Sequence, residues 1–248
     1  MSFRSRILAP AAKVDGRRGT RHVSGMSPPS PALRATQVPV TPFQQGCALV
    51  WAEGLGRGTV VDPGGDAEVI LDAVARAGFT VERILLTHGH LDHAGGAAAL
   101  RRLLEARQGA PVPVEGPDAR DAFLLEGIPA QAQAFGIDGL ESVQPDRYLS
   151  EGETLQIAGQ EFQVLHCPGH TPGHIVFVAQ ALRLALVGDV IFRGSVGRTD
   201  FPYGDHDALI SSIRDKLLPL GDDIRFLCGH GPASTFGAER RSNPFIQG

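Results

Sequence analysis

Four candidate metal ligands lie within a run of six residues: His88, His90, Asp92 and His93. Neutral imidazole and carboxylate groups suit borderline divalent ions such as zinc, and also manganese or iron. From an extended or loop segment, His88 and His90 can point the same way, while Asp92 and His93 reach toward a second point. One short loop could therefore serve two adjacent metal ions. The plain alternative is a polar loop with fortuitous histidines.

The segment before this cluster predicts where it lies in the fold. Residues 83–87 form a short apolar run typical of a buried strand, and the candidate ligands begin where the run ends. Loops at strand ends are where α/β proteins commonly keep their binding and catalytic residues. After the cluster, Gly95 and Gly96 precede a predicted helix that carries Leu100, Leu103 and Leu104 on one face. We therefore expect the cluster at the edge of a sheet.

Length and composition are those of an ordinary globular protein. The chain has 248 residues, of which 42% are hydrophobic and 20% charged, and its formal net charge is −4. No apolar run approaches the roughly 18 residues that a membrane span needs. The negative net charge does not favour a nucleic-acid partner. We expect no membrane or nucleic-acid partner, and a monomer or weak homo-oligomer.

The N-terminal stretch differs in composition from the rest of the chain. Residues 1–36 hold seven Lys and Arg against one acid, Asp15, and are rich in Ser, Pro, Gly and Ala. This composition predicts a disordered basic extension, with residues 37–248 forming the folded domain. The extension could be a basic tail or a transit-like leader. We favour a third interpretation, in which Met26 is the true start.

Three cysteines, Cys47, Cys167 and Cys228, are widely spaced and odd in number. They suggest no disulfide framework, which predicts a reducing compartment, the cytoplasm. We expect them to be buried apolar residues rather than ligands.

Hydrophobic patterns predict an alternation of strands and helices from about residue 37 onward. Residues 108–150 contain five prolines and are expected to be irregular, with short helical pieces beside the site. Two strand-rich halves indicate two sheets packed face to face with helices outside. The predicted strands cover 47–51, 59–62, 83–87, 154–157, 162–165, 175–179, 182–187 and 224–227, and the predicted helices cover 66–78, a stretch after 94 and one that Asp205 caps.

Three further segments complete a coordination set. His170 lies at the centre of the Gly- and Pro-rich segment 166–174, whose outer members His166 and His174 are expected to be structural. Asp189 ends an apolar strand, the expected place for a carboxylate that bridges two ions, and His230 ends the last strand in the same way. This predicts one metal held by His88, His90 and His170, and a second held by Asp92, His93 and His230, with Asp189 shared.

The order of these motifs resembles the metallo-β-lactamase superfamily, in which HxHxDH is followed by a His, a bridging Asp and a final His. The resemblance covers residues 40–248 and implies an α/β fold, the αβ/βα four-layer sandwich, with a dinuclear site at one edge. Within the superfamily the chain looks most like compact bacterial type II glyoxalases, the hydroxyacylglutathione hydrolases. Segments 87–93, 188–200 and 239–245 carry this closer similarity.

The similarity implies the hydrolysis of S-lactoylglutathione to lactate and glutathione, a step of methylglyoxal detoxification. Two divalent ions, zinc or else iron or manganese, about 3.5–4 Å apart would hold a bridging hydroxide that attacks the thioester. Asp92 would be the catalytic residue that orients this nucleophile. A thiolate leaves readily, because thiol pKa values lie near about 8.5. Arg198 is the expected contact to the glutathione thioester, with a loop-fixing salt bridge as its alternative role.

A different class of enzyme is the alternative. Glutathione persulfide dioxygenases resemble this family and use a single iron held by two His and one carboxylate. The availability of Asp92, His93 and His230 for a second metal favours the dinuclear hydrolase. A β-lactamase, a nucleic-acid-processing enzyme and a non-catalytic metal-binding module are less consistent with the sequence.

Overall fold

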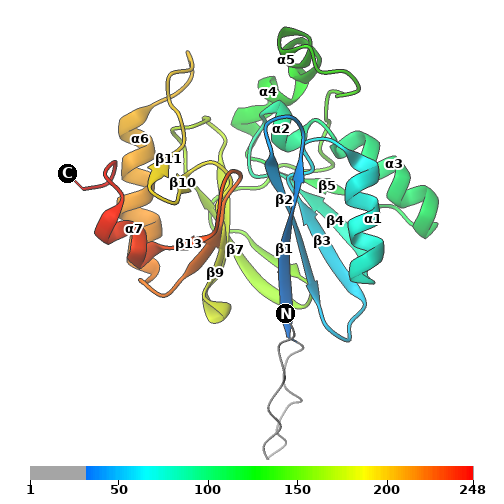
Figure 1. The fold of residues 1–248 in the computed structure, drawn as a ribbon, viewed down its shortest axis with the longest axis horizontal. Helices are drawn as coiled ribbons and strands as arrows, with labels where there is room; N and C mark the ends of the chain where they lie inside the picture. Colours follow the sequence, from blue (N-terminus) through cyan, green and yellow to red (C-terminus); the bar gives the residue numbers. More distant parts are fainter. Residues whose placement is uncertain (1–31, 248) are drawn as a thin grey trace, which may run out of the picture. The chain divides into compact units, whose positions relative to one another are not determined.

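Two β-sheets pack face to face, and helices cover the outer face of each sheet (Figure 1). This arrangement is seen in a computed structural model that describes residues 32–247. The order of layers is helix, sheet, sheet, helix. The predicted αβ/βα four-layer sandwich is therefore confirmed.

The first sheet is formed by the N-terminal half of the folded chain, and its five strands lie in sequence order. Its first three strands are antiparallel, whereas β3, β4 and β5 run parallel to one another. The long helices α1 (Ala67–Ala77) and α3 (Ala97–Gln108) provide the parallel crossovers and cover the outer face. The strands are β1 (Leu33–Val40), β2 (Gln45–Ala52), β3 (Arg57–Val61), β4 (Thr80–Leu85) and β5 (Val114–Glu115).

The second sheet has six strands in the order β13-β12-β9-β8-β7-β6. Its strands are β6 (Thr154–Ile157), β7 (Gln160–His166), β8 (Ile175–Ala179), β9 (Leu184–Leu186), β12 (Arg225–Leu227) and β13 (Ser234–Thr235). Its outer face is covered by α6 (His206–Ser211), by the π-helical and 3₁₀ turns Ser212–Leu217 and Leu218–Leu220 that continue it, and by α7 (Phe236–Ser242). A small hairpin, β10 (Ile191–Phe192) and β11 (Ser195–Val196), precedes α6.

The connection between the two sheets is irregular, as the prolines predict. It contains a 3₁₀ turn (Ala119–Asp121) and the short helices α4 (Ala122–Glu126) and α5 (Ile128–Phe135). A further short helix, α2 (Leu91–Ala94), lies nearby. In Figure 1, α2, α4 and α5 gather at the top, beside the ends of the strands. These short helices therefore form one side of the sandwich edge at which those strands end.

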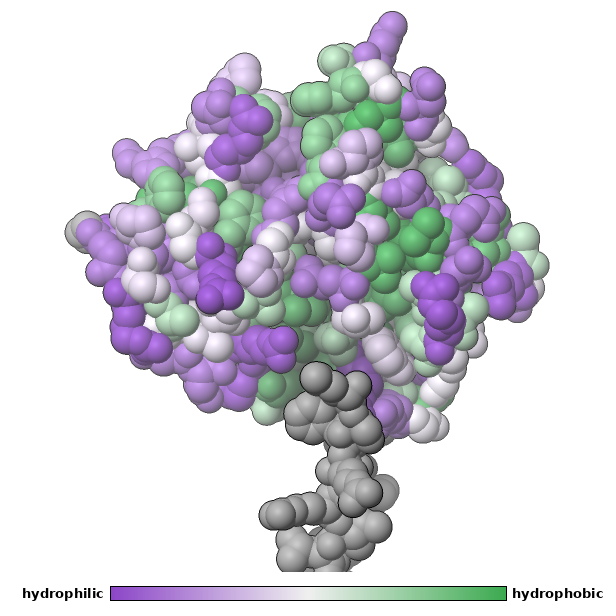
Figure 2. Space-filling view, viewed as in Figure 1, coloured by the Kyte–Doolittle hydropathy of each residue, from purple (hydrophilic) through white to green (hydrophobic). Residues whose placement is uncertain are grey.

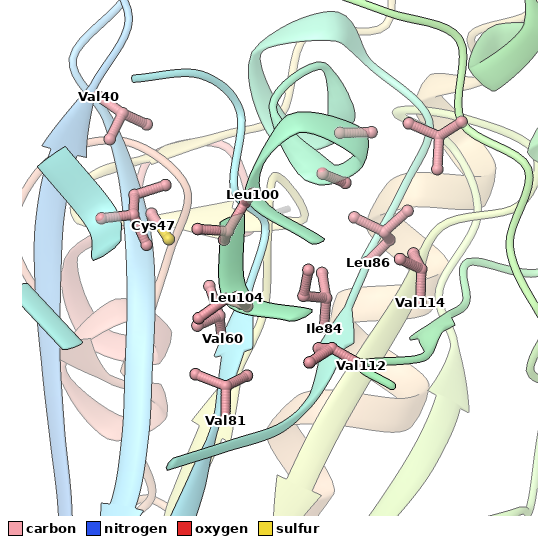
Figure 3. Packing of buried hydrophobic residues seen from close by; sticks show 14 of the residues in the cluster. Val40, Cys47, Val60, Val81, Ile84, Leu86, Leu100, Leu104, Val112 and Val114 are labelled. Atoms are coloured by element: carbon pink, nitrogen blue, oxygen red, sulfur yellow. The ribbon is translucent and has the colours of Figure 1, made fainter. Parts of the chain in front are cut away.

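Alternating strand residues divide the apolar core into three layers. On β2, Leu49 packs with the helices outside the first sheet, whereas Val50 packs between the sheets. On β8, Val176 packs under the outer helices of the second sheet, and Phe177 packs between the sheets. Figure 3 shows the first of these layers, in which Leu100 of α3 lies with residues of the sheet. This period of two is what a sheet buried on both faces requires.

The predicted boundary of the N-terminal extension is wrong. Strand β1 begins at Leu33 and pairs with β2 along its whole length, from Leu33 opposite Ala52 to Val40 opposite Gln45. Residues 33–36 are thus part of the first sheet. β1 is an edge strand in which only Val40 is buried, so backbone pairing holds it and no hydrophobic alternation marks it in the sequence. Residues 1–31 lie outside the described residues, so their predicted disorder stays a prediction.

Most other predicted elements are found with shifted ends. The predicted strand at 83–87 is β4, which begins at Thr80 and ends at Leu85. Asp205 caps α6 as predicted, because its carboxylate accepts a hydrogen bond from the Ala208 N–H at 2.9 Å. Strands β1, β5, β10, β11 and β13 and helix α7 were not predicted, since each is an edge or very short element with little pattern.

Polar side chains cover most of the face shown in Figure 2, with apolar patches between them. One patch lies over the region of α4 and α5, where Phe123 and Phe135 are exposed. None of the helices in the described range, 32–247, combines the length and apolar character needed to cross a membrane.

Phe177 tests the packing between the sheets. It is fully buried, so Phe177→Ala should lower the free energy of unfolding by about 3–5 kcal/mol through lost burial and a cavity. The control is Phe245→Ala, at a ring that is 49% exposed, where the loss should be below about 1 kcal/mol. Urea unfolding measures both. Equal losses in the two variants would contradict the layer assignment.

Candidate metal centre

The candidate ligands lie on loops that follow strands of both sheets. His88 comes three residues after the end of β4, and His230 three residues after the end of β12. Asp189 likewise follows β9, and His170 lies in the loop between β7 and β8. Loops from two different sheets therefore meet at one edge of the sandwich.

Part of the HxHxDH segment is helical rather than extended. Asp92 and His93 belong to the short helix α2, which begins directly after His90. The sequence predicted an extended or loop segment throughout. The helical turn nevertheless places Asp92 and His93 with His230 in a second set of ligands, although the ring of His93 also lies close to His88, with centroids 4.1 Å apart.

His88, His90 and His170 form a first triad. Each offers a ring nitrogen, and these atoms all lie within 4.8 Å of one another. The Nε2 of His88 and the Nδ1 of His90 are 3.1 Å apart, and all three side chains are buried. Such a close group of imidazole nitrogens matches what a divalent ion binds.

Asp92, His93 and His230 form a second triad, with ligand atoms again within 4.8 Å of one another. The Nε2 of His230 lies 3.2 Å from a carboxylate oxygen of Asp92. The side chains of Asp92 and His230 are 16% and 32% exposed, whereas His93 is completely buried. The second triad therefore has one open side.

Asp189 lies between the two triads. One oxygen is 3.2 Å from the Nε2 of His93, and the other is 3.6 Å from the Nε2 atoms of His170 and His230. Its carboxylate thus contacts histidines of both groups. This is the position that a bridging carboxylate needs.

Unsatisfied polar atoms show that divalent ions fit this centre. Within residues 32–247, the buried Nε2 atoms of His93 and His170 and one oxygen of Asp189 lack a hydrogen bond of good geometry. Burying such atoms without a partner costs about 1–3 kcal/mol each. All three face the space between the triads, so cations held there would satisfy them. The donor set of nitrogen and carboxylate oxygen suits zinc, iron or manganese.

In His93 and His170, the Nδ1 atom faces away from the centre and has a hydrogen-bond partner, which leaves the Nε2 atom to face the centre. The Nδ1 of His93 lies 2.9 Å from a carboxylate oxygen of Asp62, and the Nδ1 of His170 donates to the carbonyl of Arg198 at 2.8 Å. With a metal ion bound, the Nε2 of each ring would be the unprotonated atom that points to the centre. Outer partners of this kind fix both tautomer and ring orientation in metal sites.

Two of these outer partners were missed by the sequence analysis. Asp62 also accepts hydrogen bonds from the N–H and the hydroxyl of Thr87, at 2.7 and 2.6 Å, and so fixes the start of the ligand loop. Its signal was a carboxylate at the end of a predicted strand, the same placement as Asp189. The Tyr203 hydroxyl lies 2.9 Å from the Nε2 of His90. No local pattern marks that residue.

Electrostatics keep the first triad neutral in the metal-free protein. Burial lowers the pKa of His88 well below its usual value, and the neighbouring histidines add to this. Burial and repulsion from His170 lower the pKa of His90 to about 3. Neutral imidazole is the form that binds a metal ion. These rings are therefore already neutral at neutral pH and need not lose a proton to bind a metal ion.

The carboxylates control the second triad. Burial alone would raise the pKa of Asp189, but His93, His170 and His230 hold it well below its usual range. Burial alone would lower the pKa of His93, but Asp189 and Asp62 hold it well above. Without metal, His93 is thus the imidazolium that balances the buried carboxylates. Metal binding would displace its proton.

The remaining histidines of segment 166–174 stay outside both triads. The Nε2 of His174 accepts a hydrogen bond from the Asp189 N–H at 3.0 Å, which fixes the backbone of that residue. The Nε2 of His166 lies 2.8 Å from the carbonyl of Pro172. These contacts agree with the structural roles predicted for both.

Arg198 is engaged by its own loop. Its guanidinium makes two hydrogen bonds to Asp200, at 2.7 and 2.8 Å, and lies 4.5 Å above the ring of Phe201. The ion pair is exposed. This contact is the loop-fixing alternative, and the role of Arg198 in substrate binding stays a prediction.

All three cysteines are buried free thiols, as predicted. Burial raises the pKa of Cys167 to about 12 and that of Cys228 to about 12. Neither is therefore a thiolate at neutral pH.

Comparison with known proteins agrees with this geometry. Residues 40–230 match the family model of the metallo-β-lactamase superfamily. The chain belongs to this superfamily. Hydroxyacylglutathione hydrolase GloC of Haemophilus influenzae is 47% identical over 210 residues, which cover 84% of this chain and 96% of that protein.

Solved structures of the superfamily share the fold. BLEG-1 B3 metallo-beta-lactamase has a TM-score of 0.78 at 33% identity, covering 87% of this chain and 100% of that one. TTHA1623, crystallised in a di-iron-bound form, has a TM-score of 0.72 at 38% identity, covering 84% of this chain and 98% of that one.

Replacing Asp189 tests the shared position. Asp189→Ala should remove both metal ions, because its carboxylate contacts both triads. His166→Ala is the control, since it changes a histidine at the end of β7 that belongs to neither triad. Metal per chain after dialysis is measured by elemental analysis. Near-normal metal content in Asp189→Ala would refute the bridging assignment.

Proposed function

We propose that this protein is a metal-dependent hydrolase of glutathione thioesters, which converts S-lactoylglutathione and water to lactate and glutathione. The observation that carries the proposal is the pair of complete triads with Asp189 between them. The similarity to hydroxyacylglutathione hydrolase GloC along 96% of that protein supports the substrate class.

The proposed cofactors are two divalent ions. His88, His90 and His170 would hold one, Asp92, His93 and His230 the other, and Asp189 both. Such ions polarise a carbonyl as Lewis acids and lower the pKa of water. We propose zinc as the resident metal, with iron and manganese as alternatives that the same donor atoms accept.

The exposed side of the centre indicates where the thioester binds. His88 and His93 are fully buried, whereas Asp92 and His230 are partly exposed. The substrate carbonyl therefore approaches along Asp92 and His230. The rings of Phe201 and Tyr203 stack with centroids 5.2 Å apart beside His90, so they form an apolar wall at the same edge.

Asp92 is the proposed catalytic residue. Burial alone would raise its pKa, but its hydrogen bond with His230 lowers the pKa below the usual value, so the carboxylate is ionised at neutral pH. One of its oxygens is near His230, and the other can accept a hydrogen bond from the attacking water and orient it. The water oxygen bonds to the thioester carbon and its proton is released to solvent. The C–S bond then breaks, and the thiolate leaves without a general acid because a thiol is acidic enough.

The proposed role of Arg198 is to bind a carboxylate of glutathione. Its backbone carbonyl holds His170, so its guanidinium lies on a loop in direct contact with the first triad. Without substrate, this guanidinium donates its hydrogen bonds to the carboxylate of Asp200. A substrate carboxylate would therefore compete with Asp200 for the same donors.

The second triad also favours the hydrolase over the mononuclear iron dioxygenase. A single iron needs only two histidines and one carboxylate. Here both triads are complete, and each has buried or half-buried ligands in reach of one another. We further propose the cytoplasm as the location, because three buried free thiols suit a reducing compartment.

Turnover of S-lactoylglutathione by the metal-loaded protein tests the function. We expect metal-dependent loss of the thioester, abolished by a chelator and restored by added metal. Asp92→Asn should lower kcat by about 10²-fold or more, since the variant loses a charged acceptor for the water. Asp72→Asn, at an exposed position on α1, is the control and should leave kcat unchanged. No turnover by a protein with two bound ions would contradict the proposal.

Arg198→Ala should raise KM roughly tenfold with little change in kcat, because a charged hydrogen bond to bound substrate is lost. Asp200→Ala is the matched variant, since it breaks the same ion pair but leaves the guanidinium free for the substrate. We expect its KM to stay the same or fall. If both variants raise KM alike, the ion pair fixes the loop and Arg198 does not bind substrate.

A further inference from the structure

A buried carboxylate outside both triads has no part in the proposed reaction. Asp121 ends the 3₁₀ turn that precedes α4, and its side chain is completely buried. One oxygen accepts a hydrogen bond from the Gly173 N–H at 2.6 Å. The other accepts hydrogen bonds from the Gly89 N–H at 2.9 Å and the Thr171 hydroxyl at 2.7 Å. Both oxygens of Asp121 are therefore hydrogen-bonded, by three donors in all.

The three donors belong to the two loops that supply the first triad. Gly89 lies between His88 and His90, and Thr171 follows His170. One carboxylate thus joins two loops that come from different sheets, and each donor residue lies within three residues of a ligand. The side chain of Asp121 makes no hydrogen bond to Asp92, His93 or His230 within the described part of the chain.

Close packing reinforces these hydrogen bonds. A Cβ atom at Gly89 would lie 2.6 Å from the Cβ of Leu124 and 3.0 Å from the carbonyl oxygen of Asp121. A Cβ atom at Gly173 would lie 2.6 Å from the backbone nitrogen and 2.8 Å from the Cγ of Asp121. Both ligand loops are thus in backbone contact with the turn that carries this carboxylate. Glycine is required at both positions for that approach.

We propose that Asp121 is a positioning residue that sets the geometry of the first triad and leaves the second triad unaffected. The inference rests on the proposed metal centre and goes beyond it, because it assigns to the first ion a support that the second ion does not share. Asp62 reaches His93 directly and also holds Thr87 next to His88, whereas Asp121 acts through the backbone on both sides of the first triad alone. Loss of a support behind metal ligands typically weakens metal affinity about 10–100-fold.

Asp121→Asn is the sharpest substitution, because it keeps the shape and removes one acceptor. In either orientation of the amide, its NH₂ group faces at least one backbone N–H of a ligand loop that then lacks an acceptor. Asp118→Asn is the matched control on the same turn. Asp118 accepts from the Arg120 N–H at 3.0 Å, a cap that asparagine also makes, and its side chain bonds to neither ligand loop.

The experiment measures the affinity of each ion separately by zinc titration against a competing chelator. In a His230→Ala background, where the second triad is disabled, Asp121→Asn should weaken the remaining ion about 10–100-fold. In a His90→Ala background, which leaves the second triad, the same substitution should change affinity less than about twofold. Asp118→Asn should have no effect in either background.

Equal weakening in both backgrounds, or none in either, would overturn the inference. Urea unfolding of each variant separates a local change from global destabilisation. If Asp121→Asn fails to fold, Thr171→Val removes one of the three donors and should weaken only the first ion, severalfold. S-Lactoylglutathione turnover by the unsubstituted protein is measured in parallel. Absent turnover with selective loss of the first ion would reject the proposed substrate and retain the role of Asp121.

Discussion

The contact of the Asp189 carboxylate with three histidines is the interaction on which the rest of this structure depends. A buried carboxylate is tolerated in a protein only when cations or donors surround it. Here His93, His170 and His230 approach Asp189 from three separate segments of the chain. The fold therefore has to bring the ends of several strands to one point. The edge at which the two sheets meet is where it does so.

The four-layer sandwich supplies rigidity to that edge. Its middle apolar layer ties the sheets together through residues such as Phe177, and backbone bonds join the sheets close to the centre. The Gly46 N–H at the start of β2 donates to the carbonyl of Gly229 at 2.8 Å, next to His230. Gln37 of β1 donates from its side chain to the carbonyl of Cys228 at 2.7 Å. The first sheet thus holds the last ligand loop of the second.

How much could be predicted from the sequence depends on whether the signal was local. The seven candidate ligands follow short apolar strands or lie in a dense histidine segment, so their types and spacing were sufficient to select residues that the fold brings together. The sandwich followed from two strand-rich halves and from the family resemblance. Asp62, Asp121 and Tyr203 were missed because each acts on a ligand loop far away in the sequence, through contacts that only the folded chain creates. Strand β1 was missed for a different reason, since an exposed edge strand is held by backbone pairing and its side chains show no pattern.

The central claim is that one carboxylate joins two metal positions. Anomalous diffraction from crystals of the metal-loaded protein tests it most directly, because the scattering peaks locate each ion independently of activity. We predict two peaks, one within His88, His90 and His170 and one within Asp92, His93 and His230, with Asp189 in contact with both. A single peak at saturating metal, or two peaks of which only one contacts Asp189, would contradict the account.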